Sequence, residues 1–157
     1  MVTYYRSKLQ QSLSGTGKML AVGLSKENVE PYIKDYKKTV SVAAINSFDS
    51  LTLAGNENDL DAIAEVLVKE EIFCKKLHVE IPFHSPYMDP IKEELITRLV
   101  SLAPNNARVS LYSTVYGKQV NGTELNNEYW WLNVREPFIL PNRLMDWLKM
   151  GTIHLLK

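Results

Sequence analysis

Strand and helix patterns alternate through residues 18–81, and their order constrains the fold more than any other feature of the 157-residue chain. The clearest helix covers residues 58–71, where an apolar stripe recurs at helical spacing at Leu60, Ile63, Ala64, Leu67 and Val68. Ser25 is a suitable N-cap for a shorter helix that extends to about Tyr36. The remaining apolar runs predict four strands. Residues 39–45 and 51–54 form a hairpin in the middle of the segment, and the outer strands lie at residues 18–24 and 73–81.

The predicted order is therefore strand, helix, strand, strand, helix, strand, which is the split βαβ or ferredoxin-like arrangement. A helix from Tyr4 to Leu13 precedes it and is stopped by the glycine-rich residues 14–17. A second amphipathic helix is predicted at residues 91–102, with its stripe at Ile91, Leu95, Ile96, Leu99 and Val100. The rest of the chain predicts a strand, a short helix or loop, a helix and a last strand, at residues 109–115, 129–134, 141–150 and 152–156. We therefore expect an α/β protein.

Composition excludes several classes of partner. The chain is 45% hydrophobic, and its 18 basic residues balance 18 acidic ones, so it has no electrostatic reason to bind nucleic acid. No apolar run is long enough to span a membrane, and the first ten residues lack the apolar core of a signal peptide. The single cysteine, Cys74, reads as a core residue and excludes an internal disulfide. These features favour a cytoplasmic protein without a membrane partner.

One histidine differs from the other two in its sequence context. His84 follows a predicted strand and lies in a loop that contains Pro82, Pro86 and Pro90. Polar side chains on short loops at strand ends are often catalytic in α/β enzymes, although His84 is also placed to cap the next helix. His78 and His154 lie within predicted strands and are interpreted as structural or exposed. The histidines lack the spacing of metal ligands, so we expect no metal site.

Two further features bear on acyl-transfer chemistry. Arg6 is either an exposed surface residue or a guanidinium fork that holds a carboxylate. No serine in the sequence lies in the Gly-x-Ser-x-Gly elbow that an acyl-transferring α/β enzyme needs. Residues 14–17, Ser-Gly-Thr-Gly, follow a helix and are interpreted as a helix stop rather than an elbow or a phosphate loop.

Five motifs in series resemble the acyltransferase domains of modular polyketide synthases. Arg6-Ser7-x-Leu9-Gln10 and the run from Gly15 to Val22 are similar to the segment that follows the family's nucleophile. The other resemblances are to its "VAAVNSP…LSG" hairpin, its histidine loop and its last two signatures, at residues 40–55, 79–90, 111–115 and 129–137. The bacterial malonyl-CoA:acyl carrier protein transacylases are relatives. The paired tryptophans and the Asn-Val-Arg-Glu-Pro run at residues 133–137 make the modular polyketide type the nearer resemblance.

The resemblance implies part of an α/β-hydrolase-like large subdomain with an inserted ferredoxin-like small subdomain. Residues 1–16 would be a helix of the large subdomain, 17–81 the insertion and 82–157 the return to the large subdomain. The active site would lie in the cleft between them. His84 matches the family's general base and acid, and Asn133 the residue whose backbone carbonyl orients that imidazole. Arg6 matches the arginine that pairs with the malonyl carboxylate.

The implied reaction is ping-pong: a serine takes the malonyl group from malonyl-CoA and passes it to the phosphopantetheine thiol of an acyl carrier protein. A neighbouring ketosynthase domain of the same megasynthase is a second expected partner, and no metal or bound cofactor is required. Phe83, beside the base, would crowd an α-methyl branch, which favours malonyl over methylmalonyl.

The resemblance places the family's nucleophile elbow upstream of Met1, so we expect the isolated chain to be inactive and poorly soluble. Three alternatives fit the same sequence. The chain is also compatible with a piece of a stand-alone fatty-acid or trans-acting malonyl transacylase, or with a loading domain for another acyl group. From a different class, a ferredoxin-like unit serves in other proteins as a non-catalytic binding module.

Overall fold

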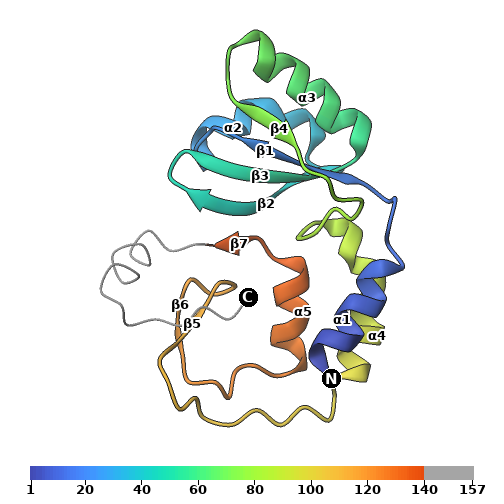
Figure 1. Cartoon of the computed structure of the whole chain (residues 1–157), viewed down its shortest axis with the longest axis vertical. Helices are drawn as coiled ribbons and strands as arrows, with labels where there is room; N and C mark the ends of the chain where they lie inside the picture. The colour runs from blue at the N-terminus through green and yellow to red at the C-terminus, as the bar shows by residue number, and fades with distance from the viewer. Residues whose placement is uncertain (140–157) are drawn as a thin grey trace.

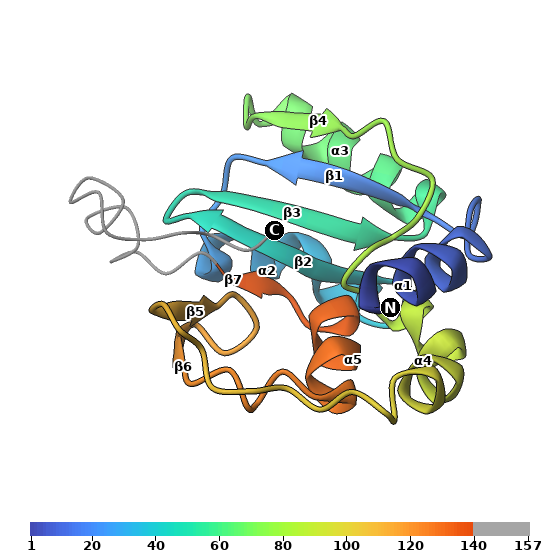
Figure 2. The ribbon, with the colours of Figure 1, turned by 60° about the horizontal axis from the view of Figure 1, so that its bottom comes forward.

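The computed structural model describes residues 1–139, which form a five-stranded sheet above a group of helices and a two-stranded ribbon (Figure 1). The strand order in the sheet is β4-β1-β3-β2-β7. The first four strands pair antiparallel, and β7 joins the edge of β2 in parallel, as Figure 2 shows. The bounds of these strands are Lys18–Val22 for β1, Val40–Ser47 for β2, Ser50–Gly55 for β3, Cys74–Lys76 for β4 and Phe138–Ile139 for β7.

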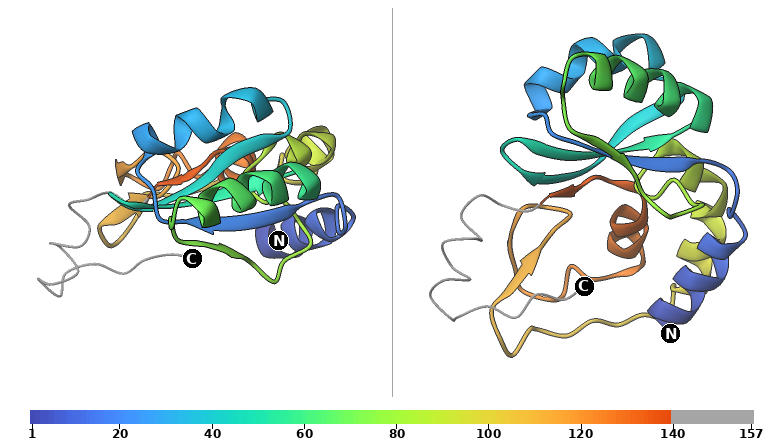
Figure 3. Two further views of the ribbon diagram at one scale, coloured as in Figure 1. Left: turned by 90° about the horizontal axis from the view of Figure 1, so that it is seen from above. Right: turned by 45° about the horizontal axis from the view of Figure 1, so that its top comes forward.

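Two helices, α2 and α3, cover one face of the sheet (Figure 3). Helix α2 spans Lys26–Ile33 and continues as a 3-10 turn, η1, at Lys34–Tyr36, while α3 spans Glu57–Lys69. The strand and helix order from β1 to β4 is the one that the sequence predicts. We call residues 18–76 the sheet lobe. Its core is a single apolar cluster shared by the sheet and both helices, and its fully buried members include Leu20, Val22, Val29, Leu51, Leu53 and Leu67.

Local signals explain where these helices begin. The Ser25 hydroxyl accepts a hydrogen bond from the Asn28 amide at 3.2 Å, so the predicted N-cap of α2 is confirmed. Asn56 caps α3 by accepting from two amides of its first turn. The predicted stripe of α3 is buried at Leu60, Ile63 and Leu67, but its last member, Val68, is 64% exposed.

The helices below the sheet form a second group, which we call the helical lobe (residues 2–13 and 82–135). Its elements are α1 at Val2–Gln11, a 3-10 turn η2 at Pro86–Ile91, α4 at Lys92–Arg98 and α5 at Asn127–Arg135. They share a separate apolar cluster whose buried members include Leu9, Met88, Leu95, Leu99, Trp131 and Val134. The ribbon pairs β5, Leu111–Ser113, with β6, Lys118–Val120.

Several predicted elements are shorter in the structure. The strand predicted at residues 73–81 is ordered as a strand only at β4, and the strand predicted at 109–115 only at β5. The helix predicted at 91–102 ends at Arg98, so Val100 is 73% exposed instead of buried. Residues 129–134, left open between helix and loop, are helical. Strands β6 and β7 have no counterpart in the sequence prediction, and the elements predicted at 141–150 and 152–156 lie outside the described residues.

Two chain segments join the lobes and run side by side. Gly15, at φ +81°, ends the turn after α1, and its amide donates to the Glu80 carbonyl at 2.7 Å. Gly17 approaches the neighbouring backbone so closely that a Cβ there would lie 2.4 Å from the Gly55 carbonyl oxygen and 2.9 Å from Cγ of Pro82. The predicted helix stop is therefore also a close junction between the lobes. No helix within residues 1–139 is long and apolar enough to cross a membrane.

Candidate active site

His84 lies where the chain leaves the sheet lobe and enters the helical lobe. Its backbone is in the left-handed region, at φ +57°, which a histidine adopts infrequently. The next residue, Ser85, is completely buried, and its hydroxyl caps η2 and donates to the Pro82 carbonyl at 2.5 Å. The helix cap is therefore Ser85, and the His84 imidazole is free for another partner. Strain of this kind is typical of functional sites.

That partner is a backbone carbonyl at the end of α5. His84 Nδ1 lies 2.8 Å from the carbonyl oxygen of Glu136. Glu136 is the C-cap of α5 and has an extended backbone, at ψ 153°, because the following Pro137 excludes a helical conformation. The extended conformation turns the Glu136 carbonyl out of the helix direction. The resemblance implied Asn133 for this role, whereas the carbonyl that lies against His84 in the structure belongs to Glu136, three residues later.

The Glu136 contact fixes the proton on the imidazole. A carbonyl oxygen only accepts, so Nδ1 carries the hydrogen and Nε2 keeps a free lone pair. Burial lowers the pKa of His84 from its ordinary value of 6.5, the Glu136 carbonyl opposes that change, and the positive charge of Arg6 lowers the pKa further. The imidazole is therefore neutral at pH 7, which is the state of a general base.

Arg6 projects from α1 toward α5, where it lines a small cavity of about 40 Å³. Its Nε is buried and has no hydrogen-bond partner within residues 1–139. Burial lowers the pKa of Arg6. The guanidinium carbon lies 5.8 Å from the centre of the Trp130 ring. The other cavity residues are Leu111, Tyr112, Thr114, Leu125, Tyr129 and Asn133. A guanidinium that lines such a cavity and has an unpaired Nε–H suits a carboxylate.

The predicted site residues fall into three positions. Arg6 lies near enough to His84 for its positive charge to lower the pKa of the imidazole. Asn133 joins Arg6 in the cavity wall. Phe83 does not line that cavity: its half-buried ring packs against the apolar cluster of the helical lobe and against a small cluster of Met19, Ala43 and Ala54 under the sheet.

Sequence reasoning missed Glu136 and Tyr129. Glu136 had a usable signal, because a residue between the end of a helix and a proline has an extended backbone and an unpaired carbonyl. Tyr129 is buried, and its hydroxyl lies 3.1 Å from Ser113 Oγ, which itself accepts from the amides of Val115 and Tyr116. Nothing in the sequence indicated that β5 and α5 meet in this way.

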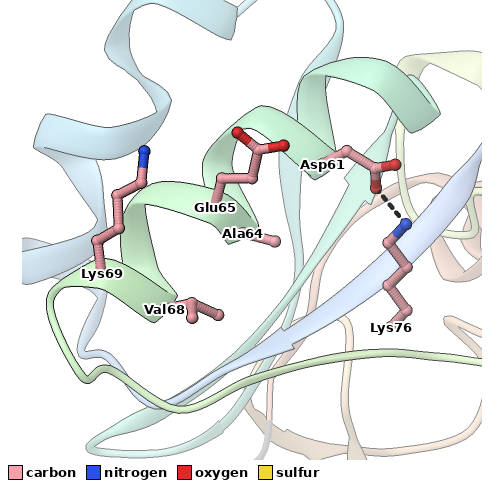
Figure 4. Close-up of a pocket in the computed structure, with 6 residues that line it drawn as sticks. All are labelled: Asp61, Ala64, Glu65, Val68, Lys69 and Lys76. Carbon is pink, nitrogen blue, oxygen red and sulfur yellow. Dashed lines mark ion pairs between the residues drawn. The ribbon is translucent and has the colours of Figure 1, made fainter.

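A larger cavity, of about 410 Å³, lies on the outer side of the sheet lobe, on α3 and β4 (Figure 4). Lys76 and Asp61 in its wall form an ion pair at 2.6 Å, and Glu65 and Lys69 add one charge of each sign. None of the residues that the resemblance implies for the active site lines this cavity. The part of the chain from 1 to 139 contains no cluster of three or more potential metal ligands.

Comparison with known proteins agrees with this geometry. Residues 1–150 match the family model described as the acyl transferase domain. The polyketide synthase GfsB of Streptomyces halstedii is 38% identical over 136 residues, which cover 86% of this chain and 2% of that protein.

Solved structures match as well. The acyltransferase domain from module 8 of the salinomycin polyketide synthase superposes with a TM-score of 0.89 at 27% identity, over 95% of this chain and 35% of the other. Malonyl-CoA:acyl carrier protein transacylase from Helicobacter pylori shares the fold, with a TM-score of 0.79 at 19% identity over 94% of this chain and 49% of the other. The chain thus spans a small part of its curated relatives. It belongs to the acyl transferase domain family and is homologous to the acyltransferase domains of polyketide synthases.

Proposed function

We propose that this chain supplies the base and the carboxylate-binding arginine of an acyltransferase that moves a malonyl group from CoA to the phosphopantetheine thiol of an acyl carrier protein. The observation that carries the proposal is the pairing of a neutral imidazole, with Nδ1 bound to the Glu136 carbonyl, and a nearby guanidinium with an unpaired, buried Nε. The first suits proton transfer, and the second suits an acyl group that ends in a carboxylate.

His84 acts in both half-reactions. In the first, Nε2 accepts the proton of a serine hydroxyl while the serine oxygen attacks the thioester carbonyl, and the proton then passes to the departing CoA thiolate. In the second, Nε2 accepts the proton of the phosphopantetheine thiol, which attacks the serine ester, and returns that proton to the serine oxygen. The Glu136 carbonyl holds the ring in place throughout, in the position that a carboxylate occupies in a Ser-His-Asp triad.

The proposed reaction needs a serine nucleophile that these 157 residues do not offer, since they contain no Gly-x-Ser-x-Gly elbow. We infer that the chain alone does not transfer acyl groups. We further infer that the sheet lobe is a ferredoxin-like insertion and that the helical lobe belongs to an α/β-hydrolase-like large subdomain. The antiparallel order β4-β1-β3-β2 supports the first of these inferences. A neighbouring ketosynthase domain is the expected recipient of the loaded carrier protein.

The test has two arms. In the first, malonyl-pantetheine and acetyl-pantetheine are titrated into the 157-residue chain; malonyl-pantetheine should bind more tightly, and Arg6→Lys should lose that preference although it keeps the charge. In the second, the chain is joined to the N-terminal half of a homologous acyltransferase domain and malonyl transfer to a carrier protein is measured. His84→Ala should slow transfer by about 10²–10⁴-fold. Equal binding of the two thioesters, or full activity of His84→Ala, would exclude the proposal.

Selection against an α-methyl branch by Phe83 is a separate proposal. The bulk of its ring beside His84 in the chain supports it, although the ring packs between two apolar clusters and outside the Arg6 cavity. In the joined protein, Phe83→Ser should raise the rate with methylmalonyl-CoA relative to malonyl-CoA. An unchanged ratio would mean that other residues make this selection.

A further inference from the structure

Arg6 is a partly buried cation that lacks an acidic partner. None of the ion pairs among residues 1–139 involves Arg6, and its Nε makes no hydrogen bond there. A buried charge of this kind is costly unless something nearby stabilises it. Burial lowers the pKa of Arg6, and the electrostatic influence of Tyr129 opposes this change.

The group that contacts the guanidinium is the aromatic ring of Trp130. The guanidinium carbon lies 5.8 Å from the ring centre, within the range of a cation–π interaction. A cation–π contact needs no hydrogen-bond acceptor, so it leaves the guanidinium N–H donors without an acidic partner. An acidic partner would instead occupy the N–H donors and compete with any carboxylate that enters the cavity. Trp130 therefore stabilises the cation without blocking the part of it that binds ligand.

The Trp130 ring is itself held in place. It packs edge-to-face on Tyr129, with ring centres 5.3 Å apart and planes at 86°, and it borders the apolar cluster of the helical lobe. Tyr129 is fixed in turn by its hydroxyl contact with Ser113, at 3.1 Å. Trp131, the next residue of α5, is buried in the helical lobe on a different side of the helix, with Lys92 Nζ 5.9 Å from its ring centre. Within residues 1–139, the cation–π pair of Arg6 is with Trp130, and that of Trp131 is with Lys92.

We propose that Trp130 is a positioning residue for Arg6: by holding the guanidinium face, it directs the N–H edge into the cavity and so gives the site its preference for acyl groups that carry a carboxylate. This inference rests on the proposed function. It assigns to one member of the tryptophan pair a role in substrate selection that does not require contact with the substrate. It also predicts that the π face, rather than the size of the side chain, is what matters.

The test compares three forms of the full chain: wild type, Trp130→Met, which keeps an apolar side chain without a π face, and Trp130→Phe, which keeps a π face. The measured quantity is the ratio of affinities for malonyl-pantetheine and acetyl-pantetheine. The ratio should fall roughly 3- to 10-fold in Trp130→Met and stay within about twofold of wild type in Trp130→Phe. The Arg6 Nε–H resonance should move further in Trp130→Met, which removes the ring current, than in Trp130→Phe, which keeps a ring.

Three results separate the possibilities. If wild type does not prefer malonyl-pantetheine, the proposed function fails. If wild type prefers it and Trp130→Met keeps the same preference, the role of Trp130 fails while the function stands. If both affinities fall together in Trp130→Met, the residue is merely structural and the inference is overturned. If Trp130→Met does not fold, the test uses wild type labelled with fluorotryptophan, because fluorination weakens the π face of the indole. The ratio of malonyl-pantetheine to acetyl-pantetheine affinity should then fall. The same label in Trp130→Phe is the control and should leave the ratio unchanged.

Discussion

The backbone conformation of His84 decides which partner its imidazole ring has. The left-handed conformation, at φ +57°, leaves the helix-capping role to Ser85 and gives the imidazole to the Glu136 carbonyl. That single contact selects the tautomer with a free Nε2. A neutral carbonyl also raises the pKa of the ring less than a carboxylate would, so burial and the Arg6 charge still leave the pKa below 6.5.

We predict that His84 titrates below pH 6.5 in the folded chain. The measurement is an NMR titration of the imidazole Cε1–H resonance, assigned by its loss in His84→Gln. Arg6→Gln should raise the pKa of His84 because it removes a nearby positive charge, whereas Arg6→Lys, which keeps the charge, should leave it nearly unchanged. A midpoint at or above 6.5 in wild type would contradict the prediction.

The same shift has a consequence for stability. Because the folded pKa lies below the unfolded one, the unfolded chain binds a proton more readily, and protonation of His84 favours unfolding. The contribution of neutral His84 is fully present above pH 6.5 and is lost as the pH falls toward the folded pKa. His84→Gln should therefore flatten the dependence of the free energy of unfolding on pH in this window.

At the scale of single elements, α3 ends in a Schellman motif whose key position is not glycine. The Ile72 amide donates to the Leu67 carbonyl at 2.9 Å and the Glu71 amide to the Val68 carbonyl at 3.1 Å. Glu71 lies between these bonds at φ +59°, where a side chain is strained. Ile72 packs against the sheet-lobe core and completes the motif.

Replacing Glu71 with glycine should therefore stabilise the chain. We expect the free energy of unfolding to rise by about 0.5–1 kcal/mol, since glycine adopts positive φ without strain. Lys69→Gly, two residues earlier in regular helix, is the matched control and should lower stability by about 1 kcal/mol. Urea unfolding with unchanged slope measures both. Loss of stability in both variants would show that the strain at Glu71 is negligible.

The sequence predicts those elements whose signals are local. Ser25 and the stripe of Leu60, Ile63 and Leu67 fixed the two helices of the sheet lobe, because a cap and a periodic apolar face act within a few residues. The sequence placed Val68 and Val100 in apolar stripes, but both side chains are exposed. Their burial depends on which part of the fold packs against that end of the helix, and the local pattern does not contain this information. Strand β7 is two residues long and forms only by pairing with β2, far away in sequence.

The same limit applies to the candidate site: local signals point to single residues, but not to the partners that the fold brings to them. His84 was proposed from its loop and Arg6 from a motif, and both remain predictions as site residues. The acceptor for His84 was placed at Asn133, because the resemblance identifies a motif while the hydrogen bond depends on where α5 stops. That end is set by Pro137, which makes Glu136 extended. Tyr129 and Ser113 meet across 16 residues through tertiary packing, which no local pattern encodes.

At the scale of the whole molecule, the two lobes have separate apolar cores, and Phe83 packs on both sides of their boundary. The close passage of Gly17 past Gly55 and Pro82 fixes this junction immediately before the His84 loop. The geometry of the candidate site therefore depends on this junction: the segment that leaves the sheet lobe leads to His84, while α1 carries Arg6 and the C-cap of α5 provides the Glu136 carbonyl.

A methyl group at Gly17 should disturb this junction. Gly17→Ala would place a Cβ 2.4 Å from a backbone oxygen that cannot move aside, so we expect a loss of about 1–3 kcal/mol in the free energy of unfolding. Gly23→Ala is the milder comparison, because its Cβ would lie 3.1 Å from Cβ of Phe73, which a shift of a few tenths of an ångström relieves. Thermal unfolding of both variants measures the difference, and equal effects would argue against a tight junction.

The two cores should also open independently, and native-state hydrogen exchange measures this. Strand β3 is paired on both sides, and Leu51 and Leu53 within it are fully buried, so its amides should exchange most slowly. The β5–β6 ribbon consists of two three-residue strands, too short to be stable alone, and its amides should exchange fastest among the strands. Malonyl-pantetheine, which would join α1 to α5, should slow exchange in the helical lobe while leaving β3 unchanged. Equal protection of β3 and the ribbon would mean that the chain unfolds as a single unit. In that case Arg6 and His84 would be assembled or lost together, and a ligand would protect both lobes alike.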